Sequence, residues 1–182
     1  MAEQIDMLST YCRRALLPAE LQVRKDIEYK PEILEVLTAI ENGTYQHQKM
    51  LFSGYNRGKT TSACACLLEF LKTRRHYVSN ECPGLFLSVH QLCYQNRTID
   101  KYNRDPELQA LIRTACATDF LILDGVFSYV TQNDDLLLQA IYDKRQHCGK
   151  TTIVTTELKD PLKVASSILF RIARDAERKV SF

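Results

Sequence analysis

The 182-residue sequence predicts an α/β fold, in which a parallel β-sheet has helices on both faces. Three observations favour this class. Strand-like and helix-like segments alternate along the chain. The run Phe120 to Leu123 is continuously apolar, as expected of a strand that is buried on both faces. A short apolar strand is followed directly by a glycine-containing polar loop and then by a helix rich in Ala and Leu.

The segment at 51–61 is typical of a phosphate-binding loop (P-loop). Gly58 lets backbone amides approach phosphate groups, Lys59 neutralises their charge, and the hydroxyl of Thr60 can bind Mg²⁺. The positive N-terminal end of the following helix faces the same anion. We therefore expect ATP or ADP as the ligand, contacted by Ser53, Gly54, Tyr55, Asn56, Arg57, Gly58, Lys59, Thr60 and Thr61.

This loop departs from the consensus G-x-x-x-x-G-K-[ST] at its first position. Ser53 stands where the consensus has glycine, and Gly54 follows it. The loop length is kept, so we expect an intact loop.

A second part of the site is expected at Asp124, at the end of the apolar run. In an α/β sheet, ligands bind beyond the carboxyl ends of the strands. Asp124 and Thr60 are therefore the predicted Mg²⁺ residues. The next position often carries a second acid that orients the attacking water, but here it is Gly125. We expect a P-loop ATPase with an altered acidic (Walker B) motif, and the sequence leaves ATP turnover open.

The other elements follow from periodicity and turn residues. The expected strands are 49–53, 85–89, the run that ends at Asp124, and 151–156. The expected helices are 31–42, 59–73, 106–117, 133–147 and about 161–174, followed by a short tail. We expect an N-terminal extension over 1–30 and a nucleotide-binding domain over 31–182.

Composition limits the location and the partners of the protein. The net charge of +2 neither requires nor excludes nucleic acid, and no run approaches the ~18 apolar residues of a membrane span. The seven cysteines are scattered and form no C-x-x-C pair, which favours reduced thiols over a disulfide framework or a zinc site. We expect a cytoplasmic protein without a membrane partner.

Taken in order, these residues resemble the ATPase domain of the DnaC/DnaI-type helicase loaders, which belong to the AAA+ class and are related to the IstB transposition ATPases. The resemblance covers roughly residues 15–182. It implies a P-loop NTPase of the AAA+/ASCE type without a C-terminal helical lid, as in a loader reduced to its ATPase core in a phage or mobile element. Besides the P-loop and Asp124, it rests on Leu16-Leu17-Pro18-Ala19-Glu20, Ser88-Val89-His90-Gln91-Leu92, Thr155-Thr156-Glu157-Leu158 and Ser167-Ile168-Leu169-Phe170-Arg171-Ile172.

The resemblance adds two catalytic candidates to Lys59 and Asp124. Arg171 matches the family's second arginine in Arg-x-x-x-Arg-Leu, which reaches the nucleotide of a neighbouring subunit and implies a head-to-tail homo-oligomer. The first arginine of that pair is Ser167 here, and Arg174 or Arg178 are alternatives to Arg171. Glu157 stands where the family has a sensor asparagine, and we hypothesise that it replaces the acid that is missing at Gly125.

The resemblance also implies partners, namely a replicative helicase or its loader, and single-stranded DNA. Residues 94–104 interleave Tyr94 and Tyr102 with three cations, so bases could stack there, although a solvated loop is an equal alternative. The first functional hypothesis is a helicase loader or remodeller of replication complexes. The alternatives are a weakly or non-hydrolysing, nucleotide-gated protein that acts on a helicase or loader, and an IstB-like transposition ATPase.

Overall fold

The structure is a computed structural model that describes residues 2–21, 28–45, 49–74, 83–98, 105–127, 131–163 and 167–182. Within these residues, five strands form one sheet in the order β2-β3-β4-β1-β5, and every adjacent pair is parallel. β4 lies between β1, which leads into the predicted P-loop, and β3, which ends at Asp124. The strands are β1 (Lys49–Ser53), β2 (Gly84–Ser88), β3 (Phe120–Asp124), β4 (Thr151–Thr155) and β5 (Arg178–Ser181).

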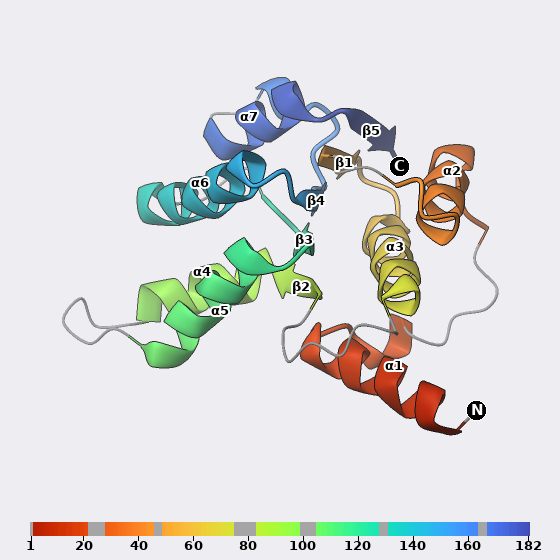
Figure 1. Ribbon diagram of the computed structural model, residues 1–182. Helices are drawn as coiled ribbons and strands as arrows, with labels where there is room; N and C mark the ends of the chain where they lie inside the picture. Colours follow the sequence, from red (N-terminus) through yellow and green to blue (C-terminus); the bar gives the residue numbers. More distant parts are fainter. Residues whose placement is uncertain are drawn as a thin grey trace.

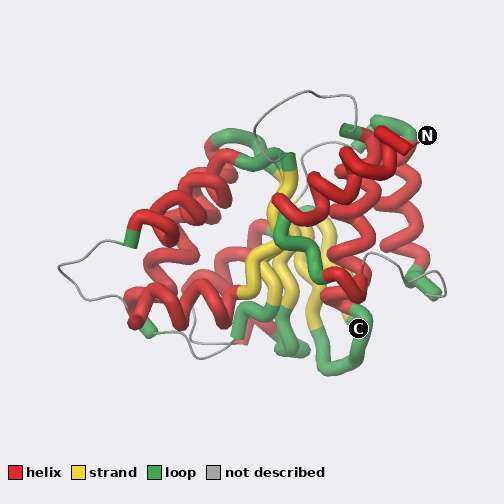
Figure 2. Tube along the Cα trace, turned by 90° about the horizontal axis from the view of Figure 1, so that it is seen from below, coloured by secondary structure: helices red, strands yellow, loops and turns green. Residues whose placement is uncertain are grey.

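Helices cover both faces of the sheet (Figure 1). One group lies on the face of α3, and the other lies on the opposite face, so that the strands are enclosed between them in the second view (Figure 2). The first group is α1 (Ala2–Arg14), α2 (Pro31–Glu41) and α3 (Lys59–Thr73). The second group is α4 (Val89–Thr98), α5 (Pro106–Ala117), α6 (Gln132–His147) and α7 (Ser167–Asp175), and short 3₁₀ helices span Ala19–Leu21 and Pro161–Lys163.

The alternation of side chains along each strand divides the core into two halves. In β3, Phe120 and Ile122 pack with the α1–α3 group, whereas Leu121 and Leu123 pack with the α4–α7 group. All four side chains are fully buried. A strand with apolar residues on both faces needs helices packed on both sides of the sheet. The packing of β3 between the two helix groups therefore confirms the parallel sheet, covered on both faces, that the sequence predicts.

Besides α4, whose start only the resemblance at residues 88–92 indicates, the structure adds two elements that the sequence does not predict. The expected tail after the last helix forms strand β5, which pairs with β1. Residues 2–14 form α1, and Tyr11 and Cys12 at its end are buried in the core beside α3. The N-terminal extension therefore packs in part onto the α/β core, and the division at residue 30 stays a prediction.

Several element boundaries differ from those expected by one residue, and two differences change how a segment is assigned. The second strand begins at Gly84 and ends at Ser88, so Val89 already belongs to helix α4. The last predicted helix is a 3₁₀ turn at Pro161–Lys163 and the helix α7, and residues 164–166 lie outside the described part.

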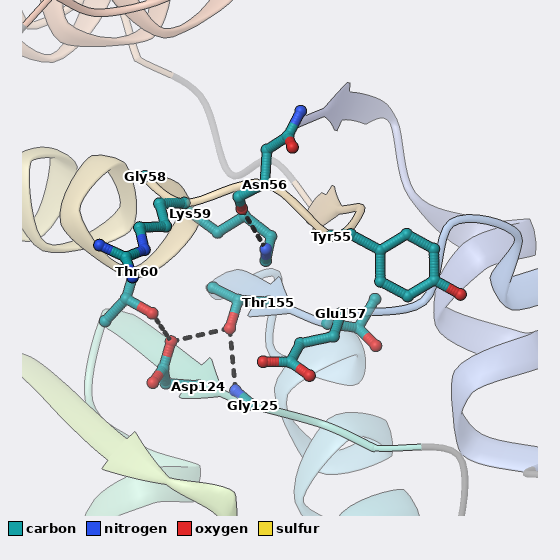
Figure 3. Close-up of a pocket in the computed structure, with 11 residues that line it drawn as sticks. Tyr55, Asn56, Gly58, Lys59, Thr60, Asp124, Gly125, Thr155 and Glu157 are labelled. Atoms are coloured by element: carbon teal, nitrogen blue, oxygen red, sulfur yellow. Dashed lines mark hydrogen bonds between the residues drawn. The ribbon is translucent and has the colours of Figure 1, made fainter.

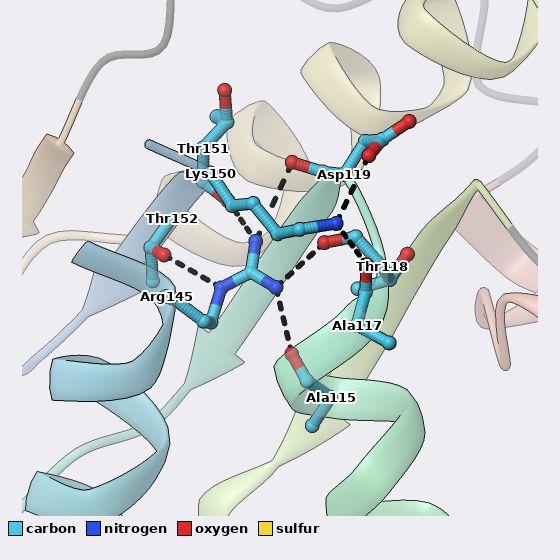
Figure 4. Close-up of polar contacts among 8 residues, drawn as sticks. All are labelled: Ala115, Ala117, Thr118, Asp119, Arg145, Lys150, Thr151 and Thr152. Carbon is cyan, nitrogen blue, oxygen red and sulfur yellow. Dashed lines mark hydrogen bonds and ion pairs between the residues drawn. The ribbon is translucent and has the colours of Figure 1, made fainter. Parts of the chain in front are cut away.

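A buried arginine ties helix α6 to the starting ends of β3 and β4 (Figure 4). Arg145 is fully buried, and its guanidinium donates to the carbonyl oxygens of Ala115 and Thr118, each at 2.7 Å. It also donates to the hydroxyl of Thr152 at 2.9 Å and to the carbonyl of Thr151. Burial lowers the pKa of Arg145 to about 10, so the group is still charged at neutral pH. With a longer bond to the carbonyl of Asp119 at 3.4 Å, the planar fork of donors reaches five backbone and side-chain oxygens at once.

An ion pair joins helices α4 and α6. The fully buried carboxylate of Asp134 accepts hydrogen bonds from Arg97 at 2.7 Å and from Asn96 at 3.3 Å. Asp134 also forms a capping box with Thr131 at the start of α6. Burial raises the pKa of Asp134, but these hydrogen bonds outweigh burial and hold the pKa below its ordinary value.

Candidate nucleotide-binding site

The P-loop begins with a glycine in a conformation that other residues rarely adopt. Ser53 is the buried last residue of β1, and Gly54 after it has a φ of 116°. A Cβ atom on Gly54 would meet the carbonyl oxygen of Phe182 at 2.1 Å, so only glycine fits. The loop is therefore intact, and the glycine that it needs is Gly54 and not the consensus position at Ser53.

Phe182 holds the loop from the side of β5. Its backbone N–H donates to the carbonyl of Ser53 at 2.7 Å. Its ring packs on the ring of Phe52, with the centroids 5.8 Å apart. A Cβ atom on Gly58 would meet the same ring at 3.5 Å. The sequence analysis did not find this residue, because nothing local to Phe182 indicates that β5 brings it to the P-loop.

The side chain of Lys59 points back into the P-loop, which precedes this residue in the sequence. Its ammonium group donates to the carbonyl oxygens of Gly54 and Asn56, both at 2.7 Å, and the residue is only 9% exposed. Gly58, with a φ of 111°, is the N-cap of α3, and its side-chain-free backbone leaves the first helical N–H groups open toward the loop. Lys59 is thus surrounded by loop carbonyls at the N-terminus of a helix, where an anion is favoured.

Three side chains form a connected polar network at the carboxyl ends of β3 and β4 (Figure 3). The hydroxyl of Thr60 donates to Asp124 Oδ1 at 2.7 Å, and the hydroxyl of Thr155 donates to the same oxygen at 2.7 Å. The backbone N–H of Gly125 in turn donates to Thr155 Oγ1 at 2.8 Å. The two predicted Mg²⁺ residues therefore lie side by side. The sequence analysis missed the role of Thr155, which only the pairing of β3 with β4 makes evident.

A cavity of about 310 Å³ lies above this network. Of the expected nucleotide contacts, Tyr55 to Thr60 line it, whereas Ser53, Gly54 and Thr61 are not among the lining residues. Asp124 and Gly125 form the β3 side, and Glu157 forms part of the β4 side. Tyr55 is 75% exposed at the rim. The structure thus brings together three of the four predicted catalytic residues, Lys59, Asp124 and Glu157, around one cavity.

Arg171, the fourth candidate, lies away from this cavity on α7. Its guanidinium pairs with Asp143 at 2.7 Å and with Asp175 at 3.8 Å, and its side chain is 34% exposed. The side chain of Arg174 is 62% exposed and pairs with the adjacent Asp175 at 2.7 Å. Arg178 pairs with Glu35 at 3.0 Å. Of the three alternatives, Arg174 is the most accessible.

The predicted DNA-contacting segment lies only partly within the described structure. Tyr94 and Arg97 belong to helix α4, while residues 99–104, with Lys101, Tyr102 and Arg104, lie outside the described residues. Tyr94 is 64% exposed, but Arg97 is paired with Asp134. Arg97 is therefore engaged within the fold and is not a free cation.

Comparison with solved structures identifies the class of fold. DnaI matches with a TM-score of 0.66 at 13% identity, covering 91% of this chain and 94% of that one. The DnaC helicase loader matches with a TM-score of 0.59 at 15% identity, covering 85% and 93%. The replication initiator DnaA, bound to AMPPCP and single-stranded DNA, matches with a TM-score of 0.64 at 17% identity, covering 91% of this chain and 50% of that one.

These likenesses show the class of fold: the chain is an α/β domain, and its parallel sheet with helices on both faces confirms the predicted fold class in these features. It has the fold that DnaI, the DnaC loader and DnaA share. No protein-family model matches the sequence, and no curated protein matches it either. Among the described residues, no helix combines the length and the apolar character that crossing a lipid bilayer requires.

Proposed function

We propose that this chain binds ATP and ADP through the cavity at the carboxyl ends of β3 and β4. The observation that carries the proposal is the gathering of Lys59, Thr60 and Asp124 around one cavity, with the amides of the glycine loop and the N-terminus of α3 at the same place. The backbone N–H groups and the ammonium of Lys59 supply positive charge for the phosphates.

The same residues fit Mg²⁺. Thr60 Oγ1 and the Asp124 carboxylate are oxygen ligands of the kind that Mg²⁺ prefers, and their contact at 2.7 Å puts both at one point of the cavity wall. A bound Mg²⁺ ion would neutralise charge on the phosphate oxygens. Thr155 holds Asp124 Oδ1 in place from the neighbouring strand.

Direct nucleotide titration tests this proposal. We expect Lys59→Ala to weaken binding of fluorescent ATP and ADP analogues at least tenfold in the presence of Mg²⁺, because a buried cation at the phosphate site is lost. Lys72→Ala is the matched control, since Lys72 lies at the far end of the same helix and pairs with Glu69 at the surface. Equal affinities for Lys59→Ala and wild type would contradict the proposal.

For the biological role, we propose an AAA+ protein that acts in DNA replication as a helicase loader or remodeller of replication complexes. The support is the fold shared with DnaI, the DnaC helicase loader and DnaA. Its partners would be a replicative helicase or that helicase's loader, and single-stranded DNA, which one DnaA neighbour carries. The exposed Tyr94 on α4 is the described residue that is best suited to base stacking. We place the protein in the cytoplasm, where replication complexes are assembled.

The second candidate is a nucleotide-gated binding protein with little or no turnover, and Gly125 favours it. An IstB-like transposition ATPase would use the same site on duplex DNA.

Two measurements separate these three functions. One is pull-down of a purified replicative helicase with and without ATP, and the other is phosphate release in the presence of single-stranded or duplex DNA. ATP-dependent capture with turnover stimulated by single strands supports the loader, capture without turnover supports the second candidate, and stimulation by duplex supports the third.

A further inference from the structure

Position 125 is where a P-loop ATPase often carries a catalytic acid, but the residue there is glycine. Gly125 follows Asp124, the proposed Mg²⁺ residue, but has no side chain, and a Cβ atom built on it would meet nothing within 4 Å. Hydrolysis of a phosphoanhydride needs a group that orients the attacking water and takes its proton. The region beside Gly125 is therefore open and lacks that group.

Asp124 is not available for this task. Its Oδ1 atom accepts hydrogen bonds from Thr60 and from Thr155, both at 2.7 Å, and it lies on the side of the cavity that fits Mg²⁺. These two hydrogen bonds and the proposed role in holding Mg²⁺ already assign Asp124 to the metal side of the site. The base has to come from another residue.

Glu157 is the other carboxylate among the residues that line the cavity. It follows the end of β4, and Figure 3 shows its carboxylate on the Gly125 side of the cavity, directed toward Gly125 and Thr155. Its exposure leaves it accessible to water. Because β4 lies beside β3 in the sheet, an acid from the end of β4 reaches the space that Gly125 leaves open.

The backbone on both sides of Glu157 is fixed. The N–H of Thr156 donates to the carbonyl of Phe52 at 2.9 Å, and Thr156 is 1% exposed. The carbonyl of Leu158 accepts from the N–H of Gly54 at 3.1 Å, which ties this segment to the P-loop itself. The backbone that carries Glu157 is thus set relative to the phosphate loop.

We infer that Glu157 is the general base of ATP hydrolysis in this chain and replaces an acid at position 125; the inference rests on the proposed ATP binding. The oxygen of water forms a bond to the γ-phosphorus, and the bond from that phosphorus to the β,γ-bridging oxygen breaks. The electron pair leaves with ADP, and the proton of the water passes to the Glu157 carboxylate. The products are ADP and inorganic phosphate.

The test separates turnover from binding. Phosphate release is measured at saturating ATP for wild type, Glu157→Gln, Glu157→Asp and the control Glu41→Gln, which alters the exposed end of α2. Dissociation constants for AMPPCP and ADP are measured on the same four proteins. We expect Glu157→Gln to lower kcat by about 10²-fold or more. Glu157→Asp is expected to retain part of the activity, and Glu41→Gln all of it.

The binding constants provide a readout that is independent of turnover. A carboxylate near the terminal phosphate repels it, so Glu157→Gln should tighten AMPPCP relative to ADP, by about threefold or more. A merely structural role of Glu157 would weaken both ligands together. The acid limb of the kcat pH profile, which reports protonation of the base, should disappear with Glu157→Gln.

Two results would overturn the inference and leave ATP binding standing. One is a Glu157→Gln protein that releases phosphate within twofold of wild type. The other is a wild-type protein that binds ATP tightly without turning it over. Failure of the wild type to bind AMPPCP or ADP would instead overturn the proposed nucleotide-binding function, so the two failures are distinguishable.

Discussion

At the residue scale, the fold depends on polar groups that local sequence does not mark. Arg145 is the largest of the fully buried side chains, and its guanidinium reaches the end of α5 and the start of β4. A buried arginine is stable only where its donors are satisfied, and here carbonyl oxygens take the place of a carboxylate partner. These oxygens would lose their donors together if the guanidinium were removed.

We predict that Arg145→Met lowers the free energy of unfolding by about 3 kcal/mol or more, because several buried acceptors lose their donors at once. Urea unfolding at pH 7 measures this loss. Lys150→Met is the matched control, since Lys150 pairs with Asp119 near the surface and should cost less than about 1 kcal/mol. Arg145→Lys should not restore stability, because an ammonium lacks the planar fork. Similar losses for Arg145→Met and Lys150→Met would contradict the structural role.

At the element scale, the hydrogen bonds on Asp134 join α4 to α6 and make that contact depend on pH. The pKa of Asp134 is lowered from its ordinary value of 3.8, because hydrogen bonds from Thr131, Arg97 and Asn96 outweigh the opposing effect of burial. A group whose folded pKa is lowered stabilises the fold fully above its unfolded pKa. That stabilisation is lost as the pH falls through the folded pKa.

We predict that Asp134→Asn lowers the free energy of unfolding by about 1–3 kcal/mol at pH 7 and by much less well below pH 3.8. The stability difference between wild type and variant should therefore shrink as the pH falls. Urea unfolding at a series of pH values from 7 to 2.5 measures it. Asp119→Asn, at an exposed ion pair, is the control. A difference that stayed constant over this range would count against the linkage.

How far the sequence predicts each element depends on where its stabilising contacts lie. The four strands of the core are predictable because each contains a run of at least three consecutive apolar or β-branched residues, as in Phe120 to Leu123. β5 was missed because its sequence Arg-Lys-Val-Ser buries only Val180, and its pairing with β1 is a long-range contact. The Lys59 loop is a local motif and was predictable. The contribution of Thr155, by contrast, depends on which strand lies beside β3.

At the scale of the whole molecule, the head-to-tail oligomer stays a prediction. The structure indicates which arginine could contact the nucleotide of a neighbouring subunit in such an oligomer. Arg171, the residue expected from the sequence, is paired with two carboxylates of its own chain. Arg174 lies one turn further along α7 with a more exposed side chain. A guanidinium that serves a neighbour's nucleotide has to leave its own partners, which is easier for Arg174.

We predict that hydrolysis per subunit rises with protein concentration, and that Arg174→Ala removes this rise while leaving affinity for ADP unchanged. Arg171→Ala is expected to lower thermal stability instead, because α7 loses its ion pair with α6. Phosphate release over a hundredfold range of concentration, with light scattering for mass, measures both. Concentration dependence that survives in Arg174→Ala and disappears in Arg171→Ala would assign the role to Arg171.

The left-handed backbone at Gly125 bears on how such a site can change over evolutionary time. With a φ of 78°, this position imposes a conformational cost of roughly 1–2 kcal/mol on any residue with a side chain. Gly125→Glu alone would carry that strain. Glu157→Asn alone would remove the cavity carboxylate that does not accept hydrogen bonds from Thr60 and Thr155. On the proposed role of Glu157, moving the acid from position 157 to position 125 therefore takes both substitutions and adds the backbone strain at 125.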